Sequence, residues 1–149
     1  MAGSVTDTDK GYARLIKQLR DLEAPGVYVG VRAAAGSDMV IIAASNEFGT
    51  SDGHVPERSY LRSTVDDGQS EIADDLQKAC TEAVDGTRDL RTGLERVGAK
   101  WVGRVQEKIR SHPPPPNAPS TIAKKHGADA SLVDTGRLRQ SIDYELRDE

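Results

Sequence analysis

Asp134-Thr135-Gly136 is the stretch of this sequence whose residue types most directly suggest chemistry, because Asp-Thr-Gly is the active-site signature of aspartic proteases. Such an enzyme needs two carboxylates that share one proton, each held on a loop between strands. One tripeptide per chain would require a symmetric dimer, and the 13 residues after Gly136 leave no room for a flap and a supporting strand. Arg137 would also place a cation beside the carboxylates. We therefore expect a structural role, in which Asp134 or Thr135 caps a helical turn and Gly136 allows close backbone packing.

Other residues with chemical potential lack the spacing that a catalytic or metal site needs. The three histidines fall in predicted loops without metal-ligand spacing; they are His54, His112 and His126. Cys80 is the single cysteine, so an internal disulfide is impossible, and it continues an apolar helical pattern from Ile72 and Leu76. This pattern predicts a buried, inert thiol. We expect no enzymatic activity, no metal and no cofactor.

Length and charge indicate one domain, spanning residues 1–149, with an uneven surface. Residues 65–86 carry seven acidic and one basic side chain, whereas residues 87–111 carry seven basic and three acidic ones. Adjacent segments of opposite charge predict complementary outer faces. The two faces meet either within one subunit or between neighbouring subunits. The N-terminus has no apolar signal core, and no run is long enough to span a bilayer, so we expect synthesis in the cytoplasm and no membrane partner.

The N-terminal half is predicted to contain a helix, a strand and a segment of undecided type. Residues 9–23 carry an apolar stripe at helical spacing, and residues 27–32 alternate valines with other residues as a strand does. The run 39–44 fits either a buried strand paired with 27–32 or a short helix capped by Ser37 or Asp38. The glycines and proline of 49–62 predict a loop.

The C-terminal half is predicted to contain two long helices, a proline-rich arm and a last strand. One helix covers 66–84; the next covers 89–110, begins at a Thr87 cap and should be the central packing helix. Its apolar stripe is Leu90, Leu94, Val97, Trp101, Val105 and Ile109. Four successive prolines make 111–134 an extended loop or arm. A helical turn and a strand close the chain at 134–147. The fold class is therefore α+β: a small mixed or antiparallel sheet packed by two or three long helices.

Two stretches, 46–62 and 116–144, together resemble a family of tailed-phage proteins. This family contains tail-completion or neck proteins grouped with lambda minor tail protein Z and the Mu-like virion morphogenesis proteins. Their motifs run in the order Asn-Glu-Phe-Gly-Thr, Pro-x-Arg-x-aromatic-Leu-Arg, Pro-Asn and Leu-(Ile/Val)-Asp-Thr-Gly-x-Leu. The matching residues here are Asn46, Glu47, Phe48, Gly49, Thr50, Pro56, Arg58, Tyr60, Leu61, Arg62, Pro116, Asn117, Thr121, Lys124 and 132–142. Tyr60 departs from the phenylalanine that is frequent in the family.

The resemblance implies a structural virion protein at the head–tail junction, made in the cytoplasm of the bacterial host. Copies would form a ring, hexameric by resemblance, that joins tail to head and lets DNA pass without specific binding. Its partners would be other copies of itself, the head-closure or connector protein, and the tail terminator or tail tube protein. A tail terminator that caps the tube is the alternative that the resemblance leaves open.

The interface residues that the resemblance implies come from both stretches. They are Asn46, Glu47, Phe48, Pro56, Arg58, Tyr60, Arg62, Asn117, Thr121, Lys124, Asp134, Thr135, Gly136 and Arg137. Arginine and aromatic residues are common at interfaces. We expect Leu61 to point inward and both Arg58 and Arg62 to face a partner.

Two other functions are compatible with parts of the sequence. The first is a homodimeric aspartic protease that uses Asp134-Thr135-Gly136. The second is a nucleic-acid-binding module that uses the basic helix; it would show steeply salt-dependent DNA binding. Its contact residues would be Arg88, Arg91, Lys100, Arg104 and Lys108. The acidic balance of the whole chain argues against this second function.

Overall fold

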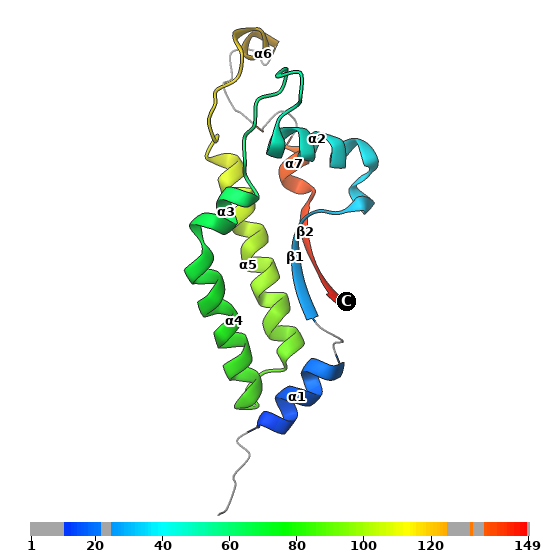
Figure 1. The fold of residues 1–149 in the computed structure, drawn as a ribbon, viewed down its shortest axis with the longest axis vertical. Coiled ribbons are helices and arrows are strands. Elements are labelled where there is room, and N and C mark those ends of the chain that lie inside the picture. The colour runs from blue at the N-terminus through cyan, green and yellow to red at the C-terminus, as the bar shows by residue number, and fades with distance from the viewer. Residues whose placement is uncertain (1–10, 22–24, 125–131, 133–135, 149) are drawn as a thin grey trace, which may run out of the picture.

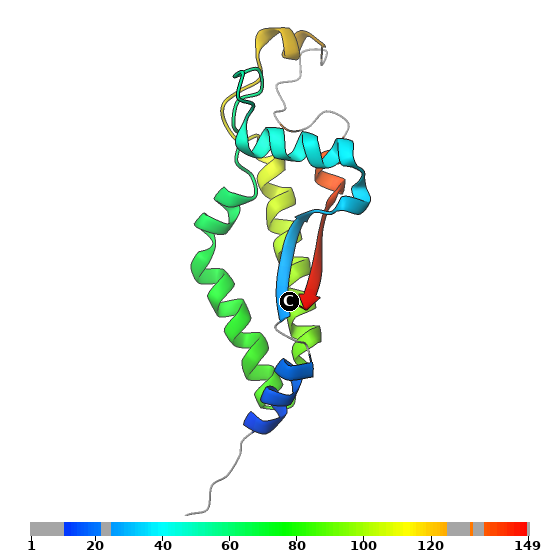
Figure 2. The ribbon, with the colours of Figure 1, turned by 45° about the vertical axis from the view of Figure 1, so that its right-hand side comes forward.

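A long helix, α5, runs through the centre of the molecule and carries a two-stranded sheet on one side and a second long helix on another (Figures 1 and 2). The computed structural model describes residues 11–21, 25–124, 132 and 136–148. The elements are α1 Tyr12–Asp21, β1 Pro25–Val31, the 3-10 helix η1 Ala33–Ala35, α2 Ser37–Phe48, α3 Arg62–Asp67, α4 Gln69–Val84, α5 Leu90–Arg110, α6 Pro119–Lys124, α7 Arg137–Gln140 and β2 Ile142–Asp148. The predicted α+β class is confirmed.

The predicted stripe of α5 forms the core, as expected from its spacing. All six of its residues are buried. Leu90 is the first residue of α5. Asp89 caps the helix, because its side chain accepts a hydrogen bond from the Thr92 backbone N–H. The expected Thr87 cap is therefore wrong, because the Thr87 hydroxyl instead donates to the Glu82 carbonyl in the turn after α4.

Strands β1 and β2 pair antiparallel, with Pro25 opposite Asp148 and Val31 opposite Ile142. Alternate residues of the two strands pack on the core, as the sequence pattern predicts. Segments at the two ends of the chain thus share one sheet. The strand alternative for residues 39–44 is wrong: the partner of β1 is the C-terminal strand.

Residues 39–44 lie in α2 because a helix places Met39, Ala43 and Glu47 on one face, four residues apart, and all three are buried. The helix begins after Gly36, whose φ of 96° is a left-handed conformation that favours glycine. No side-chain cap is formed at this end, so the expected cap by Ser37 or Asp38 is wrong.

The predicted helix 66–84 is two helices, α3 and α4, that meet at Gly68. A Cβ atom there would lie 2.2 Å from the Trp101 ring, so glycine permits the close contact with α5. The buried residues of α4 are Ala79 and Ala83, whereas Leu76 is 36% exposed and Cys80 is exposed. The expected buried thiol is therefore wrong, since α4 presents small residues to α5 and turns its larger ones outward.

The acidic α4 and the basic α5 pair with each other inside one chain. Lys100 lies 2.7 Å from Asp75, and Arg104 lies 2.7 Å from Glu71. Further bridges join Lys108 to Asp67, Lys100 to Glu71, and both Arg88 and Arg96 to Glu82. These contacts favour the intrasubunit alternative for the two charged faces. Each exposed pair contributes little to stability by itself, but the series sets the register of the two helices.

At the ends of the chain, Leu15 of α1 packs against the core beside Leu90, whereas Tyr12 is 68% exposed. The expected apolar stripe of this helix is thus only partly buried. The proline-rich arm is not wholly extended, because α6 forms within it. None of the helices that the structure describes is long and apolar enough to cross a membrane.

Two glycines of α5 should respond oppositely to alanine. A Cβ at Gly98 would lie 2.4 Å from Tyr144 Cδ2, whereas a Cβ at Gly103 would meet no atom of the described residues within 4 Å. Gly98→Ala should lower the free energy of unfolding by about 1–3 kcal/mol through overpacking. Gly103→Ala should raise it by up to about 1 kcal/mol through helix propensity. Urea denaturation measures both; equal effects would contradict the packing of β2 on α5.

Candidate functional site

Glu47, at the end of α2, is a buried carboxylate that holds the turn leading into α3. Glu47 is only 3% exposed. One oxygen accepts from the backbone N–H groups of Tyr60 and Leu61, at 2.8 and 2.9 Å. The other accepts from the Arg62 N–H at 2.9 Å and from the Ser59 hydroxyl at 2.8 Å. Four donors converge on one side chain from a segment 12 to 15 residues away.

The electrostatics of this site favour the ionised carboxylate. Burial raises the pKa of Glu47, but the hydrogen bonds from Leu61, Arg62, Tyr60 and Ser59 outweigh it and leave the pKa below its usual value. Beside it, burial and the Glu47 charge raise the pKa of the Tyr60 phenol, which donates to the Ala43 carbonyl and is completely buried. Glu47 is thus held as an ionised acceptor of hydrogen bonds, and Tyr60 as a neutral donor.

Arg58 connects this turn to the proline-rich arm. Its guanidinium Nε donates to the Pro115 carbonyl at 2.7 Å, and Nη2 donates to the Pro116 carbonyl at 3.0 Å. Its backbone N–H donates to the Asn46 carbonyl at 2.8 Å. Arg58 is 6% exposed. The expectation that it faces a partner is therefore wrong, because its donors serve the chain's own backbone carbonyls across 57 positions.

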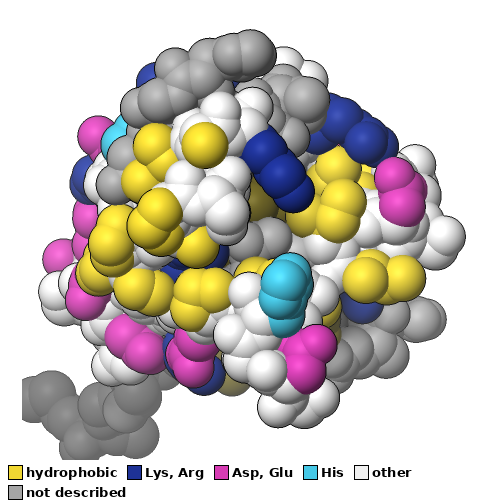
Figure 3. Space-filling model, turned by 90° about the horizontal axis from the view of Figure 1, so that it is seen from above, with side chains coloured by type: hydrophobic (Ala, Val, Ile, Leu, Met, Phe, Trp, Pro, Cys, Tyr) yellow, Lys and Arg dark blue, Asp and Glu magenta, His cyan; other side chains and the backbone are white. Residues whose placement is uncertain are grey.

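These contacts surround a cavity of about 420 Å³ at the end of the molecule that carries α2, α6 and the 49–61 loop. Seven of the predicted interface residues line it: Asn46, Pro56, Arg58, Asn117, Thr121, Gly136 and Arg137. Figure 3 views this end and shows hydrophobic side chains over much of it, with acidic ones around the rim. The two motif stretches, far apart in the sequence, thus build one surface.

The remaining predicted residues divide between buried and exposed positions. Glu47 and Tyr60 are buried and support the site from within. Phe48 is 66% exposed, and Lys124 and Arg62 are exposed, the latter in an ion pair with Glu57. Asp134 and Thr135 lie outside the described residues.

Gly136 and Arg137 begin α7. Gly136 adopts a φ of 75°, and among the described atoms a Cβ there would meet Gln140 Nε2, at 3.8 Å. The described residues do not show the expected close backbone packing at Gly136; its left-handed conformation is what favours glycine there. Arg137 forms an exposed ion pair with Asp38 at the start of α2, 3.1 Å apart. This contact lowers the pKa of Asp38.

Sequence reasoning missed the outer face of α2. Val40, Ile41 and Phe48 are 39%, 65% and 66% exposed, and Ala44 is exposed between them. We call these four residues the α2 stripe. Its signal was present, because positions 41, 44 and 48 follow helical spacing, but it became readable only once the segment was known to be a helix.

The charged side chains at the site are engaged with the chain's own residues. The Glu47 oxygens and the Arg58 donors are engaged in backbone hydrogen bonds, and the described residues hold no group of His, Cys, Asp and Glu suited to a metal. The five predicted DNA contacts, Arg88 before α5 and four residues within it, are each in an ion pair with an acidic side chain. No family model, curated protein or solved structure matches the chain.

Replacing Glu47 with glutamine tests the buried carboxylate. The folded-state pKa is lowered, so its stabilisation is present above the unfolded-chain pKa of about 4.3 and is lost as the pH falls through the folded-state pKa. Glu47→Gln should lower the free energy of unfolding by about 2–4 kcal/mol at pH 7, and the difference should shrink in acid. Glu57→Gln, at an exposed ion pair, should change it by less than about 0.5 kcal/mol. Equal losses in the two variants would argue against the Glu47 network.

Replacing Arg58 with lysine tests the attachment of the arm. Lysine cannot span the two carbonyls as guanidinium does. Arg58→Lys should raise the amide exchange rate over residues 117–124 roughly 5- to 150-fold, the effect of losing about 1–3 kcal/mol of hydrogen bonding. Hydrogen-exchange mass spectrometry measures this. Arg62→Lys is the matched control and should leave the arm unchanged; an unaltered arm in Arg58→Lys would show that other contacts hold it.

Proposed function

We propose that this protein is a structural component of a tailed-phage virion, acting at the head–tail junction as a neck or tail-completion protein. Copies assemble side by side into a ring that joins the tail to the head, and DNA passes through its lumen. The neighbouring partners are the head-closure or connector protein and the tail terminator or tube protein.

The observation that carries this proposal is the convergence of the two motif stretches on one prebuilt surface. Glu47 holds the 59–62 turn, and Arg58 holds the arm at Pro115 and Pro116. Residues that a family resemblance grouped only by order in the sequence thereby surround one cavity and adjoin the apolar α2 stripe. Rigid surfaces with exposed apolar side chains are what an assembly protein needs.

The ion pairs of α5 favour assembly over nucleic-acid binding. Lys100 and Arg104 of α5 pair with acidic residues of α4, and Lys108 pairs with Asp67 of α3, so these cations are less available to replace counterions on DNA. A ring protein must let DNA slide, and internally paired lysines and arginines suit that requirement. The charge series therefore supports a structural role.

A phage with a stop codon early in this gene tests the proposal. Negative-stain electron microscopy of the lysate should show DNA-filled heads beside separate tails that do not join, because the connecting ring is missing. Expressing the intact chain from a plasmid should restore joined particles. Tails of uncontrolled length would indicate the tail-terminator role instead. Normal joined particles from the mutant would overturn a function at the junction.

A further inference from the structure

An apolar groove opens between β1 and the α3–α4 segment, with α5 as its floor. Its volume is about 730 Å³. The floor includes Val97 and Trp101, and the walls include Val65 and Leu76 on one side and Val29 on the other. Val65 and Leu76 are 47% and 36% exposed. Among the described lining residues, the charged ones are Arg62 and Asp66.

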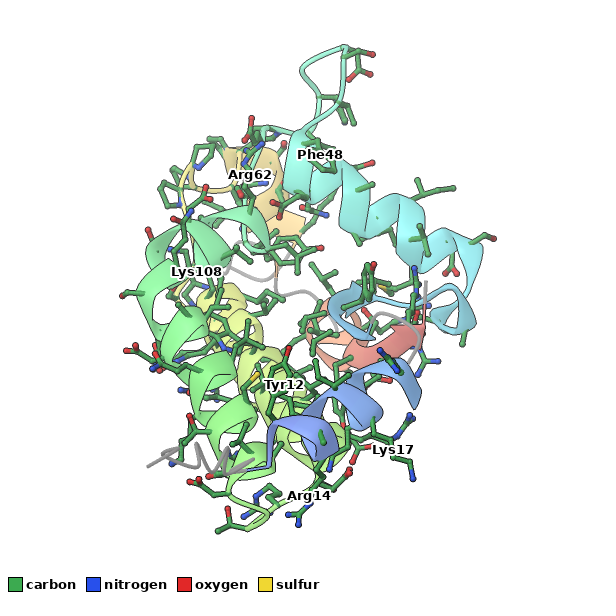
Figure 4. The ribbon with its side chains drawn as sticks, turned by 60° about the horizontal axis from the view of Figure 1, so that its bottom comes forward. Tyr12, Arg14, Lys17, Phe48, Arg62 and Lys108 are labelled. Carbon is green, nitrogen blue, oxygen red and sulfur yellow. The ribbon has the colours of Figure 1, made fainter. Side chains whose placement is uncertain are left out.

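The groove and the α2 stripe account for most of the exposed large hydrophobic side chains that the structure describes. Tyr28, Val65 and Leu76 line the groove, and Val40, Ile41 and Phe48 belong to the stripe. Ile42, also on α2, lines the cavity near Arg58 instead. No α2 residue lines the groove, so the stripe does not occupy the groove of its own chain. In Figure 4, Phe48 lies at the end of α2 beside the loop, far from Tyr12, the one other large exposed hydrophobic of the described residues.

The α2 stripe has the form of a helix that docks into a groove. Ile41, Ala44 and Phe48 follow the i, i+3, i+7 spacing of groove-binding helices, and Ala44 permits close approach. The two charged residues of α2 would not lose their partners on docking: Asp38 is paired with Arg137, and the buried Glu47 carboxylate is bonded to residues 59–62 of its own chain.

We infer that the α2 stripe of one copy inserts into the β1–α3–α4 groove of the next copy. The inference rests on the proposed ring function and names its subunit interface. A second copy is the occupant because one contact of this kind covers both apolar surfaces of every subunit. A like-with-like contact would cover only one of them. When each copy places its stripe on one neighbour and receives the stripe of another in its groove, the contact is heterologous, the kind that closes into a ring.

Two single-site variants, each damaging one surface, test the interface in the full chain. Phe48→Asp damages the stripe, and Val65→Asp damages the groove; both positions are exposed, so the fold should tolerate them. Ile41→Asp and Leu76→Asp provide a second pair. Tyr12→Asp is the matched control on an exposed apolar residue elsewhere. Circular dichroism checks the fold of each variant, and sedimentation velocity measures association over the full solubility range.

The wild type and Tyr12→Asp should associate alike, while each stripe or groove variant should weaken association at least about thirtyfold, as loss of an interface hot spot does. Mixing Phe48→Asp with Val65→Asp should give one-to-one dimers and nothing larger, because exactly one intact stripe can meet one intact groove. A monomeric wild type, variants that assemble normally, or a mixture that does not pair would each overturn the inference.

These results are separable from the test of function. Unjoined heads and tails in the stop-codon phage, together with a failed mixing experiment, would retain the junction role and remove this interface. Successful mixing together with normal particles would retain the interface between copies and remove the junction role.

Discussion

The buried Glu47 carboxylate is the interaction on which the upper end of the molecule depends. Three backbone N–H groups and one hydroxyl of residues 59–62 converge on it, which fixes the turn that starts α3. A carboxylate removed from water is stable only when its oxygens are satisfied, so the network is strongly coupled: removing the Glu47 carboxylate leaves four donors without their acceptor. The position of Tyr60, which fills the core beneath, follows from the same contact.

The second constraint is the close packing around α5. Small residues at the crossings allow approach: Gly93 meets Ala79, and Gly98 meets Tyr144. Large apolar residues fill the remaining stripe. Charged residues of α4 and α5 lie outside this seam and pair across it, so the helices are held apolar side inward and polar side outward. The sheet is thereby placed against one flank of α5, and the groove beside β1 is left open.

The fold was largely predictable, whereas the site was predictable only as a set of residues. The α5 stripe and the β1 alternation have periods long enough to identify a helix and a strand. Resemblance grouped residues 46–62 with 116–144, and the cavity does bring members of both together. The sequence predicts that the Arg58 side chain faces a partner, but it points inward. Its hydrogen-bond partners are carbonyls of the arm, 57 and 58 positions away. No local pattern encodes such a pairing.

By itself, the sequence determined the elements whose burial is set by local periodicity: the central helix α5, the strands β1 and β2, and the break after each long helix. The tertiary structure decided the rest. It made 37–48 a helix, because only a helix turns Met39, Ala43 and Glu47 together toward the core. It also turned Cys80 and the α2 stripe outward. The physical reason is that an apolar run can bury one face or another, and which face is buried depends on neighbours that are distant in the chain.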